Sequence, residues 1–84
     1  MATILFLRGW RLFFYSNERN EPPHIHIRKG DVDCKFWIHP ERFDISEAYS
    51  YNANPSDLRI IRQIIFDHFD YIVAEYEKIH GENK

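Results

Sequence analysis

Two histidines separated by a single residue, His24 and His26, are the side chains most suited to chemistry in this sequence. They follow two prolines in the segment NEPPHIHIRKG, residues 20–30, and Arg28 comes two positions later. Side chains two residues apart on a strand project to the same side, about 6–7 Å apart along it. The spacing is compatible with a metal site, with an acid–base pair, or with histidines that hydrogen-bond the proline loop and orient it without chemistry.

A metal site needs more ligands than these two histidines supply. Zinc takes a third or fourth ligand at about 2.0–2.2 Å. The candidates are His39, Glu21 and Asp33, and the spacing forces none of them inward. Cys34 falls on the apolar side of its predicted strand, away from the histidines. We therefore predict that the protein holds no structural metal and needs no cofactor.

An acid–base site needs fewer groups. Histidine titrates near neutral pH, so one member of the pair removes a proton while the other donates one. A cation stabilises the charge that builds on a phosphate, and no metal is needed when the nucleophile is a ribose 2′-hydroxyl. This alternative makes His24, His26 and Arg28 the catalytic residues of a metal-independent ribonuclease. The sequence leaves open whether the protein is an enzyme.

Hydrophobic periodicity predicts the elements that position these residues. Gly30 and Asp31 predict a tight turn that closes a hairpin. Residues 41–51 are compatible with one further short strand. Apolar and β-branched runs with polar breaks between them predict strands at residues 3–7, 10–16, 24–29 and 32–39.

The C-terminal part of the chain has the pattern of an amphipathic helix over about residues 55–80. Asn54 is a favourable N-cap, and Pro55 suits the first helical position. The strands and the helix together predict one domain, residues 1–84, with an α+β fold: a small antiparallel sheet of about four to five strands and one long C-terminal helix on one face. The apolar stripe of the helix consists of Leu58, Ile61, Ile65, Phe69, Ile72, Tyr76 and Ile79.

Alternation assigns side chains to the two faces of the sheet. Ile25 and Ile27 point toward the helix, so His24 and His26 point away from it, and we expect both to lie exposed on a working surface. Rings stack on unpaired bases and cations hold phosphates, while Tyr, Trp and Arg are also favoured in protein interfaces. The predicted binding residues are Arg11, Phe13, Tyr15, Glu21, Lys35, Trp37 and His39.

Composition indicates a soluble cytoplasmic protein. The 84 residues contain one cysteine, which cannot form an internal disulfide, and no apolar run is long enough to cross a bilayer. The charge is uneven: residues 1–42 hold seven Lys or Arg and five Asp or Glu, whereas residues 43–84 hold four and eight. Such a split can mark two faces with different partners.

The segments FFYSNERNEPPHIHIRKG and KFWI, followed by DHFDYIVAEYEKIHG, resemble a family of small bacterial proteins, domain of unknown function 4160. The resemblance covers nearly the whole chain, and its hallmark, Asn-Glu-Pro-Pro-His-Ile-His, falls on residues 20–26. It implies one half of a two-gene, toxin–antitoxin-like cassette whose partner is a small protein encoded by a neighbouring gene. RNA or DNA is the less direct implied target. Relatives more often carry a tryptophan where this chain has Tyr76.

The resemblance implies that the chain is one subunit of a toxin–antitoxin-like module. Its aromatic and cationic sheet face, with the histidine pair, would bind a protein partner and, as a further ligand, nucleic acid. A metal-independent ribonuclease and a small metal-binding protein are the alternatives. The sequence leaves open the toxin or antitoxin role, the identity of the partner and the formation of a homodimer, and it predicts no association with a membrane.

Overall fold

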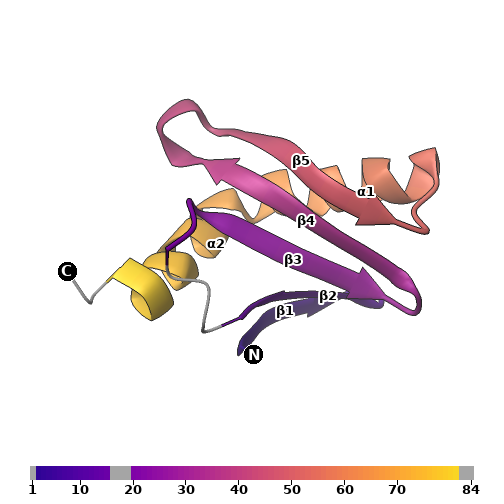
Figure 1. Cartoon of the computed structure of the whole chain (residues 1–84), viewed down its shortest axis with the longest axis horizontal. Helices are drawn as coiled ribbons and strands as arrows, with labels where there is room; N and C mark the ends of the chain where they lie inside the picture. Colours follow the sequence, from indigo (N-terminus) through magenta and orange to yellow (C-terminus); the bar gives the residue numbers. More distant parts are fainter. Residues whose placement is uncertain (1, 16–19, 82–84) are drawn as a thin grey trace.

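The computed structural model describes residues 2–15 and 20–81 of the chain. Five antiparallel strands form one sheet in their order along the chain, and two helices lie behind that sheet in the view of Figure 1. This arrangement confirms the predicted α+β fold class. The elements are β1 (Ala2–Leu7), β2 (Trp10–Phe14), β3 (His24–Lys29), β4 (Val32–His39), the 3₁₀ turn η1 (Pro40–Arg42), β5 (Asp44–Tyr51), α1 (Pro55–Asp67), α2 (Phe69–Tyr76) and the terminal π-helical turn η2 (Glu77–Gly81).

Two-residue turns close the first and third hairpins. Arg8 and Gly9 both have positive φ, 53° and 85°, as a turn with the twist of the flanking strands requires. The predicted turn at Gly30 and Asp31 is confirmed, and Gly30 has a φ of 60°. β2 ends at Phe14, before the predicted end, and Ser16 lies outside the described residues.

Both edge strands contain a bulge. In β5, Lys35 pairs with Tyr49 and Phe36 with Glu47, so Ala48 has no residue directly opposite on β4. In β1, the register shifts between Thr3 and Leu5, at Ile4. The hydroxyl of Tyr71 on α2 donates a hydrogen bond to the Ile4 carbonyl at 2.7 Å, which fixes the first strand to the helix layer.

The helical region begins where the sequence predicts. Asn54 Oδ1 accepts a hydrogen bond from the Asp57 backbone N–H at 2.7 Å, and Asp57 Oδ2 accepts one from the Asn54 N–H. The prediction of one continuous helix is wrong, because α1 ends at Asp67 and α2 begins at Phe69. Among the described residues, no helix has both the length and the apolar character that a membrane span requires.

The break between the helices is at His68, which has φ −122° and ψ 27°. Its Nδ1–H donates to the Ile64 carbonyl at 2.9 Å, and the same carbonyl accepts from the His68 backbone N–H at 3.2 Å. A side chain that competes for a backbone acceptor in this way distorts the helix locally. Ile72 N–H still bonds to the His68 carbonyl, so the chain continues in nearly the same direction.

The predicted contact between the helical stripe and the isoleucine face of the sheet is confirmed. Ile61, Ile65, Phe69 and Ile72 are buried, and Leu58 packs against them. From the sheet, the core takes Trp10, Leu12, Phe14, Ile25, Ile27, Val32, Cys34, Phe36 and Ile38.

The thiol of Cys34 is buried in this core and unpaired with another cysteine. Burial, reinforced by the negative charges of Glu47 and Asp33, raises its pKa from 9.0 to about 11. The thiolate is the reactive form, and a pKa two units higher leaves about 100-fold less of it at pH 8. We expect a thiol reagent at pH 8 to modify the native protein at least about 100-fold more slowly than the protein in denaturant. Equal rates in the two states would contradict this burial.

Candidate binding site on the open sheet face

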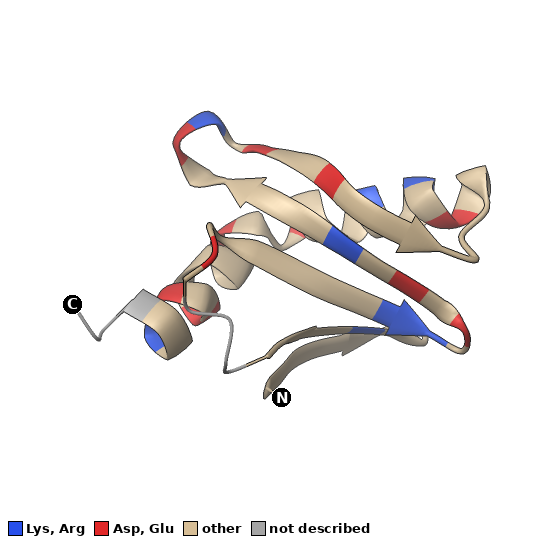
Figure 2. Cartoon of the chain, in the orientation of Figure 1, with Lys and Arg blue, Asp and Glu red and all other residues tan. Residues whose placement is uncertain are grey.

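The sheet face that points away from α1 and α2, which we call the open face, carries side chains in rows that cross the strands. Alternation places Arg11 and Phe13 there together with His26, as predicted. Figure 2 shows the basic end of β3 and the basic and acidic positions along β4. The middle row consists of Thr3, Phe13, His26, Lys35 and Tyr49, and the outer row, nearer the two-residue turns, consists of Phe6, Arg11, Arg28, Asp33 and Tyr51.

His26 is packed among rings. Its imidazole stacks on Phe13, with centroids 5.4 Å apart and an interplanar angle of 20°. The Tyr15 ring meets it edge-on at 4.7 Å, and the His24 ring does so at 5.2 Å. Stacked and edge-to-face pairs at these distances are favourable geometries for aromatic rings. The His26 imidazole is therefore enclosed by rings on this face of the sheet.

The segment before β3 is held by hydrogen bonds to three consecutive carbonyls. The Glu21 carbonyl accepts from the Tyr76 hydroxyl at 3.1 Å. The Pro22 carbonyl accepts from His24 Nδ1–H at 2.9 Å, and the Pro23 carbonyl from the Ile38 N–H at 2.9 Å. The two prolines have no backbone N–H to donate. Their carbonyls are therefore the polar backbone groups of the Pro-Pro segment that need hydrogen-bond partners. His24 thus orients the proline loop, as one of the sequence alternatives proposed.

Lys35 lies opposite His26 on β4 and is only 8% exposed. Its ammonium donates a hydrogen bond to the Glu21 carboxylate and lies 4.5 Å from the centre of the Trp37 ring. A buried ammonium requires a partner of this kind, because an unpaired charge is costly away from water. Glu21, Lys35 and Trp37 therefore lie together on this face.

Two residues of the C-terminal helical region also belong to this cluster. His80 stacks on Tyr76 with centroids 4.6 Å apart, and His80 Nε2–H donates to the Tyr15 carbonyl at 3.2 Å. The rings of Tyr76 and His24 lie 6.1 Å apart. Sequence analysis left both residues out of the site. Their four-residue spacing, which puts them on one helical face, was the signal that could have indicated a joint contact.

The predicted exposure of the histidine pair is wrong. His24 is 0% exposed and His26 is 2% exposed. The physical reason is that rings from β2 and from the helical region pack against them, which strand alternation alone does not predict. A general acid or base must come within hydrogen-bond reach of its substrate, so this burial does not favour the acid–base alternative. The catalytic roles of His24, His26 and Arg28 stay predictions.

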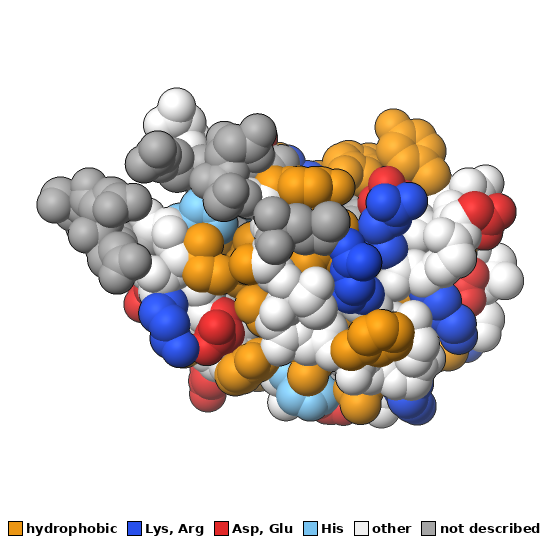
Figure 3. All heavy atoms as spheres, turned by 90° about the horizontal axis from the view of Figure 1, so that it is seen from below, with side chains coloured by type: hydrophobic (Ala, Val, Ile, Leu, Met, Phe, Trp, Pro, Cys, Tyr) orange, Lys and Arg blue, Asp and Glu red, His pale blue; other side chains and the backbone are white. Residues whose placement is uncertain are grey.

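The outer row contains exposed rings and an exposed cation. Phe6 is 68% exposed and Tyr51 is 60% exposed, and they lie at the two ends of the row, on the edge strands. Arg28 is exposed, whereas Arg11 and Asp33 are half-buried. On the surface seen from below, Lys and Arg side chains lie directly beside hydrophobic ones (Figure 3).

His39 is separate from the cluster. It lies at the end of β4, where it pairs with Asp44, and its ring Nε2 is 2.9 Å from the Ser46 hydroxyl oxygen. Within residues 2–15 and 20–81, no group of three or more His, Cys, Asp or Glu side chains is arranged to hold a metal ion.

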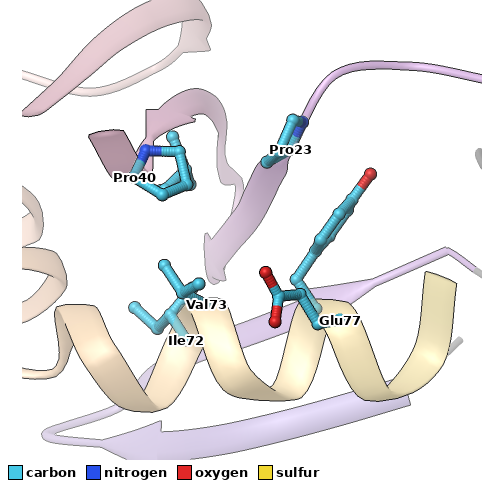
Figure 4. A pocket seen from close by; sticks show the side chains of 7 residues that line it. Pro23, Pro40, Ile72, Val73 and Glu77 are labelled. Atoms are coloured by element: carbon cyan, nitrogen blue, oxygen red, sulfur yellow. The ribbon is translucent and has the colours of Figure 1, made fainter. Parts of the chain in front are cut away.

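A small pocket lies on the other side of the proline loop, between α2 and the ends of β3 and β4. Pro23 and Pro40 face Ile72 and Val73 across it, with Glu77 at its rim (Figure 4). The wall is almost entirely apolar, and it contains two predicted stripe residues, Ile72 and Tyr76, but none of the predicted binding residues. Tyr76, whose ring also lies near His24, therefore connects this pocket to the histidine cluster.

The fold and the site define a class: a small α+β protein with an antiparallel five-stranded sheet and an aromatic and basic open face. Residues 9–77 match the family described as Domain of unknown function (DUF4160), and the chain belongs to that family. No curated protein and no solved structure matches the chain. The matched region begins after β1, so Phe6 lies outside it.

Proposed function

We propose that this protein is one subunit of a toxin–antitoxin-like two-gene module and binds a small protein partner through its open face. The observation that supports this proposal is the outer row, in which the exposed rings of Phe6 and Tyr51 flank Arg11, Arg28 and Asp33. Aromatic residues and arginine are enriched at protein interfaces and carry much of their binding energy. The two-gene context rests on the family resemblance of the sequence.

The composition of the row favours a protein over nucleic acid. A nucleic-acid surface neutralises successive phosphates with a stripe of basic residues. Here Asp33 lies directly opposite Arg28, and the ammonium of Lys35 is already paired with Glu21. The formal net charge of the whole chain is −2. A partner with side chains of both signs is therefore a better match than a phosphate backbone.

Replacing Tyr51 with serine should weaken the complex with the product of the neighbouring gene at least about tenfold. A ring that is 60% exposed in the free protein would lose its buried contact area in the complex, and interface tyrosines often contribute 2 kcal/mol or more. Phe6→Ser should have a similar effect from the opposite end of the row. The measurement is co-expression and co-purification of the two products, followed by calorimetric titration.

Phe43 provides a matched control. Its ring is 56% exposed, but it packs on Phe69 with centroids 4.5 Å apart, on the helix side of the molecule. Phe43→Ser should leave the affinity within about twofold of the unchanged protein. Loss of the complex with Phe43→Ser but not with Tyr51→Ser would place the partner on the helix side and contradict the proposal.

A further inference from the structure

We infer that the partner carries a carboxylate that pairs with Arg28 and a basic side chain that pairs with Asp33, both enclosed between apolar contacts to Phe6 and Tyr51. This inference rests on the proposed function and adds the chemistry of the partner. It follows from the order of side chains in the outer row, which crosses all five strands.

Arg28 is the centre of the argument. Its side chain is exposed at the end of β3, and no carboxylate of the described residues lies within 4.0 Å of its guanidinium. Arginine presents a planar set of donors that fits a carboxylate with two parallel hydrogen bonds. A carboxylate of the partner would use this capacity.

The neighbour of Arg28 on β2 increases the local positive charge. Arg11 lies directly opposite Arg28, and like charges at directly opposite positions of a sheet are unfavourable. The Arg11 guanidinium carbon lies 4.8 Å from the centre of the Phe13 ring, which holds this cation at the surface of the middle row. Arg11 and Arg28 are therefore two neighbouring basic positions of the outer row.

Asp33 determines the charge of the partner group that binds beside Arg28. It lies directly opposite Arg28 on the other side, and yet the two side chains form no ion pair within 4.0 Å. A basic group of the partner would therefore meet an available carboxylate. The complementary surface has an acidic and a basic side chain in neighbouring positions, which a polypeptide can provide and a phosphate backbone cannot.

The rings at the two ends of the row would strengthen the charged pairs between them. Neighbouring strands are about 4.8 Å apart, so the row from Phe6 to Tyr51 spans about 19 Å. Apolar contacts around charged pairs exclude water and strengthen their interaction. Charge complementarity of this kind also orients the partner and speeds its association.

The test uses the full-length protein and the product of the neighbouring gene. Arg28→Glu should weaken the complex at least about tenfold, and Asp33→Lys at least about threefold. Arg59→Glu is the matched control, because Arg59 is exposed on α1, on the opposite side of the sheet, and should change the affinity less than twofold. The affinity of the unchanged pair should fall as salt is raised from 50 to 500 mM. Thermal denaturation of each variant shows whether its fold is intact.

A charge exchange gives the decisive result. An acidic residue of the partner whose change to arginine restores binding to Arg28→Glu, while weakening binding to the unchanged protein, would establish the predicted pair. A complex that forms but is equally affected by Arg28→Glu and Arg59→Glu would overturn the inference and leave the proposed function standing.

Two other outcomes also overturn the inference. Absence of any complex between the unchanged proteins would overturn the proposed function with it. If Arg28→Glu abolishes retention of a single-stranded oligouridine probe but leaves the protein complex unchanged, the outer row binds nucleic acid instead.

Discussion

Replacing Ile65 with alanine should lower the free energy of unfolding by about 2–5 kcal/mol. The side chain is fully buried on α1, in the core shared with the sheet. Its truncation removes apolar contacts and leaves a cavity that the five strands and two helices cannot fill without moving. The measurement is equilibrium unfolding in urea, with the slope of the transition compared between the two proteins.

Gln63 on the same helix is the control for this change. Its side chain is exposed, so Gln63→Ala should alter the free energy of unfolding by no more than about 0.5 kcal/mol. A cost below about 0.5 kcal/mol for Ile65→Ala would mean that α1 does not pack on the sheet as described.

The general fold was predictable because local patterns determine most of it. The alternation of Ile25 and Ile27 with His24 and His26 assigned the two faces of β3 correctly, and the Asn54 cap marked the start of α1. Each of these signals depends on side chains within a few residues of one another. The continuity of the helix was not predictable in this way, because it depends on whether the His68 imidazole bonds its own backbone or water.

The composition of the outer row depends on two bulges that the sequence does not reveal. Without the bulge at Ala48, Tyr49 and Tyr51 would share the face of Glu47, which points toward α1 and lies 3.7 Å from the Arg62 guanidinium. The bulge moves both tyrosines to the open face. The bulge at Ile4 does the same for the outer end of β1, where it places Phe6 opposite Arg11. Sequence analysis therefore identified the arginines of the row but not its rings.

The burial of the histidine pair comes from contacts between residues far apart in the sequence. The hydroxyl of Tyr76 reaches the Glu21 carbonyl across 55 residues, and His80 reaches the Tyr15 carbonyl across 65. These contacts close the end of the sheet where β2 and β3 are no longer paired. In the described structure, His24 organises the proline loop, and the accessible chemistry of the open face lies in the outer row.

Replacing His26 with alanine should lower the free energy of unfolding by about 2–4 kcal/mol, by comparison with other buried rings. The imidazole is 2% exposed and contacts the rings of Phe13, Tyr15 and His24, so its loss leaves a cavity in the middle row. Replacing an exposed histidine with alanine would lower the free energy of unfolding far less. The measurement is urea unfolding under the conditions used for Ile65→Ala.

Two further variants separate ring packing from other roles of His26. His26→Phe keeps a flat ring in contact with Phe13 and should recover at least half of the stability lost in His26→Ala. His39→Ala removes a half-buried imidazole that bonds the Ser46 hydroxyl at the end of β4, and should cost less than about 1 kcal/mol. If His26→Phe recovers nothing, the nitrogen atoms of the imidazole carry the stability. If His26→Ala unfolds as the unchanged protein does, the ring is not packed as described, and its predicted role in catalysis becomes the stronger explanation for its place in the sequence.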